Sequence, residues 1–511
     1  MRDLCCFPKA GKHRDPRRQE NTSGRAMKTL ARISAICACV AYAPLATAQI
    51  GQQEFAARRD SLAKRLDSGV VIAFGGRTPV ADFGPFHQLP AFHYLTNFDE
   101  PDATFVMVVR RGRGSPTLFV TAADPRSAFY YGWRPDSAAV SRSFGVAGRS
   151  SSALTSVVDS LAGVGLPFYT LNDFEDADFA RADSLTRGRI YIRTIAERHP
   201  GLVVRDGHPF VDELRARKSP AEIALLRRAA EISSEGHRAA LLAPLPQHEY
   251  ELQAVLEYTF TRLGGTRPAY GSIVGSGQNG TQLHYMKDRG ATRPGDLVVI
   301  DAATEYEAYA ADITRTLPVS GTFTLEQRQI YQLVRDAQAA AERNAKPGRS
   351  AQAAQDSSVV VRARGLAALG LIESADALYD PPWQANCERI PASCKQATFW
   401  MIHGISHGLG LAVHDPAQFS YGNRVYKPGD VFTIEPGIYV SSRMLAALPD
   451  TPRNRAFIDK VKSVVPRYEN TGVRIEDDYV ITDTGLERIS TAPREIPEIE
   501  ALMKQRPRPV P

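Results

Sequence analysis

The chain has 511 residues and a formal net charge of +6 at pH 7. The first 48 residues hold nine of the 62 Lys and Arg and three of the 56 Asp and Glu, so the other 463 residues carry 53 of each and no net charge. This balance gives no case for binding nucleic acid or an anionic membrane surface, and 463 residues are enough for two or three domains with ordinary cores.

The first 48 residues have the pattern of an export signal. Residues 27–32, which contain Lys28 and Arg32, precede an apolar run over 33–45 and the small residues Ala-Thr-Ala at 46–48. This order predicts a secretory signal over 27–48, and the run is too short to span a bilayer, which takes about 20 apolar residues. We interpret the basic residues 1–26 as an upstream extension, with a disordered tail on a cytosolic protein as the alternative. We therefore expect an exported protein, periplasmic or extracellular, without a transmembrane segment.

The next part of the chain alternates between helical and strand patterns. We expect helices over 54–66, 152–163 and 179–187, and strands over 70–74, 103–109, 116–120 and 189–192. Alternation over about 150 residues predicts a small α/β domain at residues 49–214. It has no Gly-rich phosphate loop and no cluster of metal ligands, so we expect the chemistry elsewhere.

A strong helix signal lies at residues 218–233. Ser219 is a favourable N-cap, Pro220 fits the first turn, and Glu222 stands three residues after the cap, where it can complete a capping box. We place a domain boundary near residue 215, just before this helix.

The remaining chain alternates short β runs with Gly-containing turns, broken by longer helical patterns. Helices are expected over 247–263, about 325–345 and 352–369. All the candidate chemistry lies in this half. We therefore interpret residues 215–500 as a catalytic domain and residues 501–511 as a tail.

Two aspartates are expected to meet at a strand hairpin. LeuValValIleAspAla (297–302) is an apolar strand with Asp301 near its end, and AspIleThrArgThr begins at Asp312. Two antiparallel strands joined by a short turn would bring these carboxylates together. An uncompensated carboxylate in such an apolar run is costly, which favours a bound cation. A strand-end Asp and an unrelated turn Asp are the alternative.

Cys387 and Cys394 are the two cysteines beyond residue 48. A pair in an exported, Pro-rich stretch is typical of a local disulfide that staples a surface loop, and its spacing does not fit a zinc CxxC pair. We expect a disulfide, with two free thiols as the alternative.

Residues 403–415, HisGlyIleSerHisGlyLeuGlyLeuAlaValHisAsp, hold His403, His407 and His414. The glycines disfavour a helix and favour a strand or loop in which backbones approach closely. A metal centre rich in carboxylates needs few imidazoles. The other histidines are then free to bind substrate and move protons near neutral pH.

Two glutamates complete the set of candidate metal ligands. Glu435 lies in ThrIleGluProGlyIleTyr (433–439), and Glu476 follows Arg474 on the same face of an expected strand. Either Glu alone is most often a surface carboxylate.

Together with the residues above, the candidate ligands are Asp301, Asp312, His407, Glu435 and Glu476. Four carboxylates and one imidazole are too many anionic oxygens for a lone zinc ion. They suit two adjacent divalent cations such as manganese, and a site of that kind activates water. Hydrolysis is therefore predicted.

This ordered set resembles the pita-bread metallopeptidases, specifically the proline-directed branch of aminopeptidase P and prolidase. PheHisTyrLeuThrAsnPheAspGluPro (92–101) is similar to a segment of that family's amino-terminal domain. The resemblance implies an α/β N-terminal domain of the creatinase/aminopeptidase P type, followed by an α+β pita-bread catalytic domain. Relative to compact members, segments 376–398 and 441–470 look like insertions that could form a rim or lid.

The resemblance also implies roles for individual residues. The five candidate ligands would hold two ions, usually manganese, with Asp312 and Glu476 bridging them. Residues that bind substrate or move protons would be His284, His403, His414, Tyr439 and Arg474.

The implied activity is that of a metal-dependent Xaa-Pro aminopeptidase, a metallo-exopeptidase that removes the N-terminal residue from peptides with proline second. A hydroxide bridging the metals would attack, Glu435 would take the proton of the water, His414 would steady the oxyanion, and His403 would hold the primed side of the substrate. A prolidase-type Xaa-Pro dipeptidase is the alternative, followed by a creatinase-like or non-catalytic relative. The expected partners are peptides with penultimate proline and, as is usual in the family, further copies of the chain in a dimer or tetramer.

Overall fold

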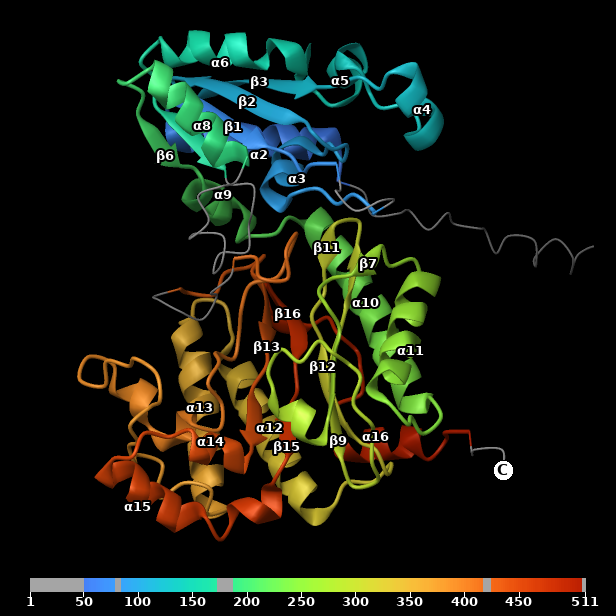
Figure 1. Cartoon of the computed structure of the whole chain (residues 1–511), viewed down its shortest axis with the longest axis vertical. Coiled ribbons are helices and arrows are strands. Elements are labelled where there is room, and N and C mark those ends of the chain that lie inside the picture. Colours follow the sequence, from blue (N-terminus) through green and yellow to red (C-terminus); the bar gives the residue numbers. More distant parts are fainter. Residues whose placement is uncertain (1–49, 79–83, 172–186, 417–423, 508–511) are drawn as a thin grey trace, which may run out of the picture. The chain divides into compact units, whose positions relative to one another are not determined.

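The computed structural model describes residues 50–78, 84–171, 187–416 and 424–507 (Figure 1). The chain beyond Ala48 forms one compact unit. The expected signal, the upstream extension and most of the expected helix at 179–187 lie outside the described residues. Within the described part of the chain, no helix combines the length and the apolar character that crossing a membrane requires.

The N-terminal half contains a mixed sheet with the strand order β4-β3-β2-β1-β5-β6 among the described residues. Strands β1, β2 and β3 pair antiparallel, whereas β4, β5 and β6 join the sheet in parallel. The strands are β1 (Gly69–Phe74), β2 (Thr104–Arg110), β3 (Arg113–Val120), β4 (Ala147–Ser150), β5 (Phe168–Leu171) and β6 (Val204–Asp206). The strands expected at 70–74, 103–109 and 116–120 are confirmed, as is the α/β class of this half.

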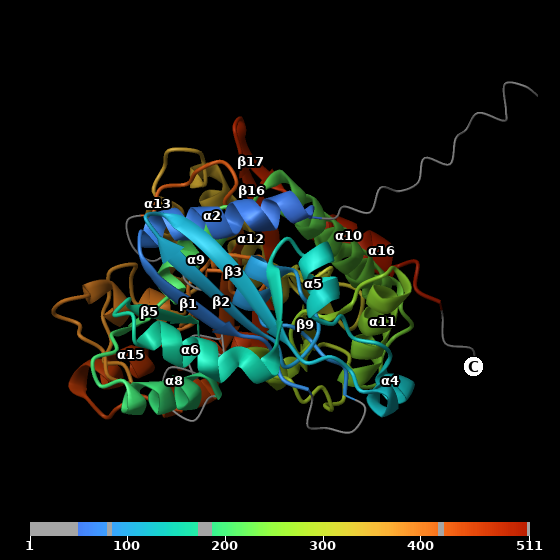
Figure 2. The same cartoon turned by 90° about the horizontal axis from the view of Figure 1, so that it is seen from above.

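Helices cover both faces of this sheet (Figures 1 and 2). Helices α6 and α8 bury Val158 and Ile195 against Val70 and Ile72, and α2 packs on β2 and β3. The helices of this half are α2 (Gln52–Leu66), α3 (Pro90–Thr96), α4 (Pro125–Tyr131), α5 (Ser137–Ser143), α6 (Leu154–Ala162), α8 (Arg187–Arg198) and α9 (His208–Arg215). Helices α2 and α6 confirm the helices expected at 54–66 and 152–163.

Residues 189–192 lie within helix α8, so the strand expected there is wrong. The alternating polar and apolar residues of this tetrad have the period of a strand. The buried side chains, however, are Ile192 and Ile195, three positions apart, while Ile190 is exposed. That spacing belongs to one face of a helix, and the packing of this face on the sheet outweighs the local alternation.

The C-terminal half places its strands between two groups of helices (Figure 1). Helix α10 begins after Ser219 with the predicted capping box to Glu222. The connector from α9 to α10 contains the domain boundary predicted near residue 215, which stays a prediction. The helices are α10 (Pro220–Leu242), α11 (Glu249–Arg262), α12 (Leu325–Asn344), α13 (Ala351–Ala368), α14 (Ser442–Ala446), α15 (Pro452–Val461) and α16 (Ile496–Met503). Helices α10 to α13 confirm the four helices expected here.

Short sheets form the centre of this half. The described sheets have the orders β12-β9-β8, β13-β16-β17, β11-β10-β7 and β14-β15. The strands are β7 (Arg267–Pro268), β8 (Ile273–Ser276), β9 (Leu297–Asp301), β10 (Thr304–Tyr306), β11 (Tyr309–Ala310), β12 (Thr314–Pro318), β13 (Val431–Ile434), β14 (Gly437–Val440), β15 (Thr471–Arg474), β16 (Asp477–Thr482) and β17 (Gly485–Arg488). Residues from β9, β12 and β15 share one hydrophobic core with α10, α11, α12 and α13, which is the α+β organisation expected of this domain.

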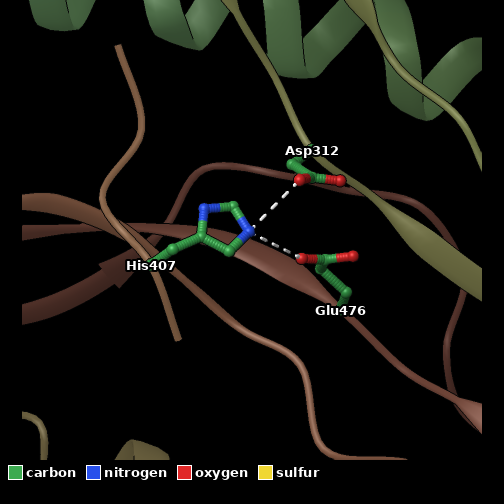
Figure 3. Close-up of side chains that lie close together, drawn as sticks. All are labelled: Asp312, His407 and Glu476. Carbon is green, nitrogen blue, oxygen red and sulfur yellow. Dashed lines mark ion pairs between the residues drawn. The ribbon is translucent and has the colours of Figure 1, made fainter. Parts of the chain in front are cut away.

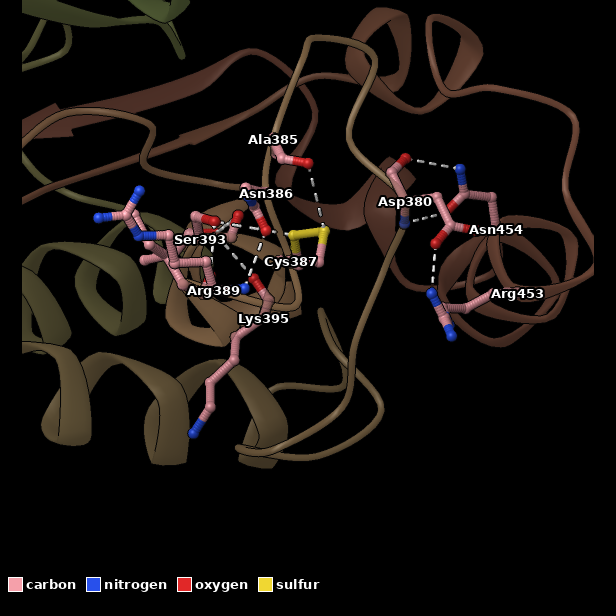
Figure 4. The surroundings of a disulfide bond; sticks show 12 residues. Asp380, Ala385, Asn386, Cys387, Arg389, Ser393, Lys395, Arg453 and Asn454 are labelled. Carbon is pink, nitrogen blue, oxygen red and sulfur yellow. Dashed lines mark hydrogen bonds and ion pairs between the residues drawn. A yellow bond between two sulfur atoms is a disulfide. The ribbon is translucent and has the colours of Figure 1, made fainter.

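The two segments interpreted as insertions pack against each other (Figure 4). Asp380 donates its backbone N–H to Asn454 Oδ1 across 2.9 Å, and Asn454 Nδ2 donates back to Asp380 O across 2.8 Å. Thr451 and Arg453 contact the Asp380 carboxylate. Cys387 and Cys394 form the expected disulfide within the first segment. The two segments therefore support each other as one substructure.

Candidate metal centre

The β9–β12 hairpin brings the two predicted aspartates together. Asp301 ends β9 and pairs with Thr314 of β12, so Asp312 lies just before the antiparallel partner strand. A turn at Glu307 and Ala308, both with positive φ, joins β10 to β11 between them. Two consecutive positive φ values are typical of tight hairpin turns that match the twist of their strands. The hairpin predicted from the sequence is confirmed.

His407 approaches the hairpin from a segment that runs beside β13. His407 N donates to Thr433 Oγ1 across 3.3 Å, and Thr433 N donates to His407 O across 3.0 Å. Two residues earlier, Ile405 O accepts from Glu435 N across 2.7 Å. The described residues 403–415 contain no helix, as expected. This pairing fixes His407 and Glu435 on neighbouring backbones.

The side chains of Asp312, His407 and Glu476 point toward one another (Figure 3). His407 Nε2 lies 3.4 Å from Asp312 Oδ2, 3.7 Å from Glu435 Oε1 and 3.8 Å from Glu476 Oε1. One ligand atom from each of Asp312, His407 and Glu476 lies within 4.8 Å of the other two. The structure thus gathers residues that are 164 positions apart in the sequence, at 312 and 476, around one imidazole nitrogen.

Thr314 links the β9–β12 hairpin to Glu476, which lies between β15 and β16. Its Oγ1 donates to Glu476 Oε2 across 2.6 Å, and its backbone O accepts from Glu476 N across 3.1 Å. Arg474 Nε donates to the same hydroxyl across 3.1 Å. The carboxylate of Glu476 is therefore oriented by Thr314, a residue of the β9–β12 hairpin.

The electrostatics of the site favour a bound cation. Burial and the charge of Asp301 raise the pKa of Asp312 well above its usual range, and burial and Asp312 do the same to Glu476. Burial and Glu476 raise the pKa of Glu435 to about 8. Asp301 differs: although burial opposes it, the Arg474 guanidinium lowers its pKa. The buried carboxylates repel one another when they are ionised, and bound divalent cations would compensate this charge. Several carboxylate oxygens with one imidazole are also a donor set that suits such cations.

Arg474, Tyr439 and His403 form a hydrogen-bonded chain beside the carboxylates. Arg474 Nη2 donates to Asp301 Oδ2 across 2.5 Å, and Nη1 donates to the Tyr439 hydroxyl across 2.8 Å. The same hydroxyl lies 3.0 Å from His403 Nε2, and His403 Nδ1 lies 3.5 Å from Glu435 Oε2. Burial and Arg474 lower the pKa of His403 to about 3, so its imidazole is neutral.

His284 and His414 have exposed side chains. The His414 ring lies edge-on to His407 with ring centroids 4.3 Å apart. His284 is within electrostatic range of Asp301, His403 and His414. All ten predicted site residues therefore lie in or beside one centre, while their individual roles stay predictions.

Two residues of the centre have no counterpart among the sequence predictions. The Tyr270 hydroxyl lies 2.6 Å from Asp301 Oδ1 and 2.5 Å from Asp312 Oδ1. His237 of α10 lies with Nε2 2.8 Å from Ala302 O, next to Asp301. Neither residue stands in a motif with the candidate ligands, and His237 contacts a backbone carbonyl. The sequence therefore carries no signal for them, whereas Thr314 lies inside the motif that begins at Asp312.

Comparison with known proteins agrees with this architecture. Residues 224–483 match the model of metallopeptidase family M24, and residues 55–163 match the aminopeptidase P N-terminal domain. The chain is 34% identical over 465 residues to the Xaa-Pro aminopeptidase of Escherichia coli K12, which covers 89% of this chain and 98% of that protein. It is 33% identical over 319 residues to the human Xaa-Pro dipeptidase, covering 58% of this chain and 62% of that protein. Proline aminopeptidase P II from Yersinia pestis has a similar structure, with a TM-score of 0.72 at 32% identity, over 89% of this chain and 100% of that one.

Proposed function

This chain belongs to metallopeptidase family M24 and has the two-domain, pita-bread architecture of aminopeptidase P, and on that basis we propose that it is an Xaa-Pro aminopeptidase. It would remove the N-terminal residue from peptides with proline in second position. The observation that carries the proposal is the convergence of Asp301, Asp312, His407, Glu435 and Glu476 in a chain that spans 98% of the E. coli Xaa-Pro aminopeptidase.

A prolidase-type dipeptidase is the second candidate. The human Xaa-Pro dipeptidase matches over 62% of its own length, whereas the E. coli aminopeptidase matches over 98%. The longer match includes the N-terminal domain, and this difference favours the aminopeptidase.

We further propose that the five candidate ligands, Asp312 and Glu476 among them, would hold two divalent cations, most suitably manganese. Oxygen-rich donor sets suit manganese better than zinc. When bound, such a pair of cations lowers the pKa of a shared water and supplies a hydroxide nucleophile near neutral pH.

The protein's own side chains would then direct the reaction. Glu435, whose Oε2 lies 3.5 Å from His403 Nδ1, would accept the proton of the water. His403, held through Nε2 by Tyr439, would bind the primed side of the substrate as a neutral imidazole. His414 would donate to the oxyanion that develops on the scissile carbonyl, since preorganised donors at that position are worth several kcal/mol, roughly 3–4. His284 and Arg474 would help to orient the substrate.

Export to the periplasm or the extracellular space is also proposed. The support is the signal pattern at residues 27–48 together with the Cys387–Cys394 disulfide, because disulfides persist mainly in oxidising compartments. Immunoblotting of cell fractions for a product that begins after Ala48 tests this location.

Assembly into a dimer or tetramer is proposed as well. Helix α4 and the residues after it expose Phe129, at 94%, and Trp133, at 76%, and exposed clusters of large apolar side chains often mark interfaces. Light scattering of the purified protein tests this, and a monomer at all concentrations would overturn it.

The activity is tested with purified residues 49–511 loaded with manganese. Arg-Pro-Pro, Arg-Ala-Ala and Gly-Pro are incubated separately and products followed by mass spectrometry, with Glu435→Ala as the inactive control. Release of Arg from Arg-Pro-Pro, with Arg-Ala-Ala intact, is expected. Cleavage of Gly-Pro alone would establish the dipeptidase, and metal-independent or absent cleavage of all three would overturn the proposal.

A further inference from the structure

Asp415, the residue after His414, is bonded through all four of its polar atoms. Its N–H donates to Gly408 O across 2.8 Å, and its Oδ2 accepts from Leu411 N across 2.9 Å. Its backbone O accepts from Lys218 Nζ across 2.6 Å, and its Oδ1 accepts from Arg215 Nε across 3.1 Å. The first two bonds are local to the histidine segment. The other two come from residues about 200 positions earlier.

Arg215 is the last residue of α9, and Lys218 lies in the connector that leads from α9 to α10. Arg215, Lys218 and Asp415 are each at least 95% buried, where an unpaired charge is costly. Although burial opposes it, Arg215 and Lys218 lower the pKa of Asp415, so the buried carboxylate is compensated by these two partners, while burial lowers the pKa of Lys218 itself. Charge-assisted hydrogen bonds in such a setting hold their partners in a narrow range of positions.

The segment 407–416 folds tightly onto this cluster. Gly408 N donates to Pro416 O across 2.9 Å, which brings the two arms of the segment side by side. A Cβ on Gly410 would lie 2.3 Å from Asp415 Oδ2 and 2.8 Å from Lys218 Cε, so a side chain there would displace both groups. One arm carries His407, and the other carries His414, whose ring lies 4.3 Å from the His407 ring.

We propose that Arg215 and Lys218 are positioning residues that hold His414 in its catalytic place through Asp415. The inference rests on the proposed function, in which His414 donates to the developing oxyanion. Because Asp415 is fixed by two side chains and two backbone bonds, the adjacent His414 backbone is fixed as well, and its imidazole projects from a rigid arm. The connector between the two halves of the chain thereby takes part in setting the geometry of the active site.

A purely structural role would give different results from a positioning role. A cluster that only adds stability would lower the melting temperature and leave turnover of the folded enzyme intact. A cluster that positions His414 lowers kcat more than it raises KM, and its effect disappears once His414 is gone. A double-mutant cycle separates these cases.

The test uses the manganese-loaded enzyme with Lys218→Met, Arg215→Met and the milder Arg215→Lys, each alone and combined with His414→Ala. Arg217→Met, an exposed arginine of the same connector, is the matched control. We expect kcat on Arg-Pro-Pro to fall roughly 10- to 100-fold in Lys218→Met, as for small displacements of reacting groups. Arg215→Lys should retain more activity than Arg215→Met, and each substitution should cost less than about twofold in the His414→Ala background.

A second readout does not depend on turnover. In protein labelled with ¹³C at histidine Cε1, the His414 resonance is assigned by its loss in His414→Ala. It should shift or broaden in Lys218→Met and in Arg215→Met and stay in place in Arg217→Met. An unchanged His414 resonance in Lys218→Met and Arg215→Met would overturn the inference. So would independent effects on kcat, in which each of these substitutions lowers kcat by the same factor with and without His414→Ala. Wild-type protein that cleaves no Xaa-Pro peptide would overturn the proposed function alone, because the resonance still tests the positioning.

Discussion

Arg474 and Asp301, 173 positions apart in the sequence, form a buried ion pair with Nη2 and Oδ2 at 2.5 Å. This contact compensates one of the four carboxylates of the centre by a protein cation. It also explains why the pKa of Asp301 is lowered while those of Asp312, Glu435 and Glu476 are raised. The chain itself therefore separates the carboxylates into one that is charged without metal and three that favour protonation until cations bind.

Replacement of Arg474 should lower the unfolding free energy more in the metal-free protein than in the manganese-bound protein. Arg474→Met leaves Asp301 as a buried carboxylate without its partner, which typically costs about 3–5 kcal/mol. With manganese bound, the cation takes over part of this compensation, so the loss in unfolding free energy should be smaller. Urea unfolding with EDTA and with manganese measures both values, and Arg474→Lys, which keeps the charge, is the control. Equal losses in the two forms would contradict this account.

The metal-free protein should become less stable as pH rises. The folded-state pKa of Glu435 is about 8, and those of Asp312 and Glu476 are also raised. The folded state thus binds more protons than the unfolded state between the ordinary carboxyl pKa, about 4, and pH 8, and stability falls across that window. Melting temperatures in EDTA from pH 5 to 8 should show this fall. Glu435→Gln should flatten it, and the exposed Glu231→Gln should not.

Manganese should remove that pH dependence. Bound cations hold the carboxylates ionised, so no proton is taken up on folding in this range. The same melting series with saturating manganese should be flat or rise with pH. A fall of the same size with and without metal would mean that other groups cause it.

His237 should matter for metal affinity. Its Nε2 bonds to Ala302 O at 2.8 Å, and burial lowers its pKa to about 4, so the ring is neutral and can donate. His237→Leu removes this support beside Asp301, and calorimetry should show manganese binding weakened roughly 10- to 100-fold, the range for groups that orient ligands. His237→Gln, which retains a donor, should bind more tightly than His237→Leu. Unchanged affinity in both variants would make His237 an ordinary core residue.

The stability of segments 376–398 and 441–470 should depend both on the hydrogen bonds between Asp380 and Asn454 and on the Cys387–Cys394 disulfide. Asn454 is fully buried and makes reciprocal bonds with Asp380 (Figure 4), so Asn454→Ala should lower the unfolding free energy by about 1–3 kcal/mol. The Cys387–Cys394 bond closes a short loop, and Cys387→Ser with Cys394→Ser should cost about 2–3 kcal/mol. Chemical unfolding of each variant measures these losses. Values near zero would show that the substructure unfolds separately from the rest.

The candidate ligands could be brought together from the sequence because each stands in a short motif with a local physical reason, while their binding of metal stays a prediction. Asp301 ends the apolar strand β9, and Glu435 precedes a Pro and a Gly that turn the chain. Tyr270 and His237 were not predictable, because their partners are a carboxylate pair and a carbonyl distant in sequence. Helix α8 shows the converse: four alternating residues predicted a strand, and packing of Ile192 and Ile195 on the sheet decided for a helix. Local patterns determine an element only where tertiary contacts agree with them.

The two hydrogen bonds between Thr314 and Glu476 bear on the stage of folding at which the metal centre forms. The hairpin of residues 301–316 cannot complete the set until the strands near residue 476 have docked on it. Such a long-range contact forms late, because a long loop must close first. A cation is therefore captured only by a nearly finished fold. During folding we therefore expect the centre to take up its first metal from the ions present where the last strands dock, and the folded protein can still be loaded with manganese after purification.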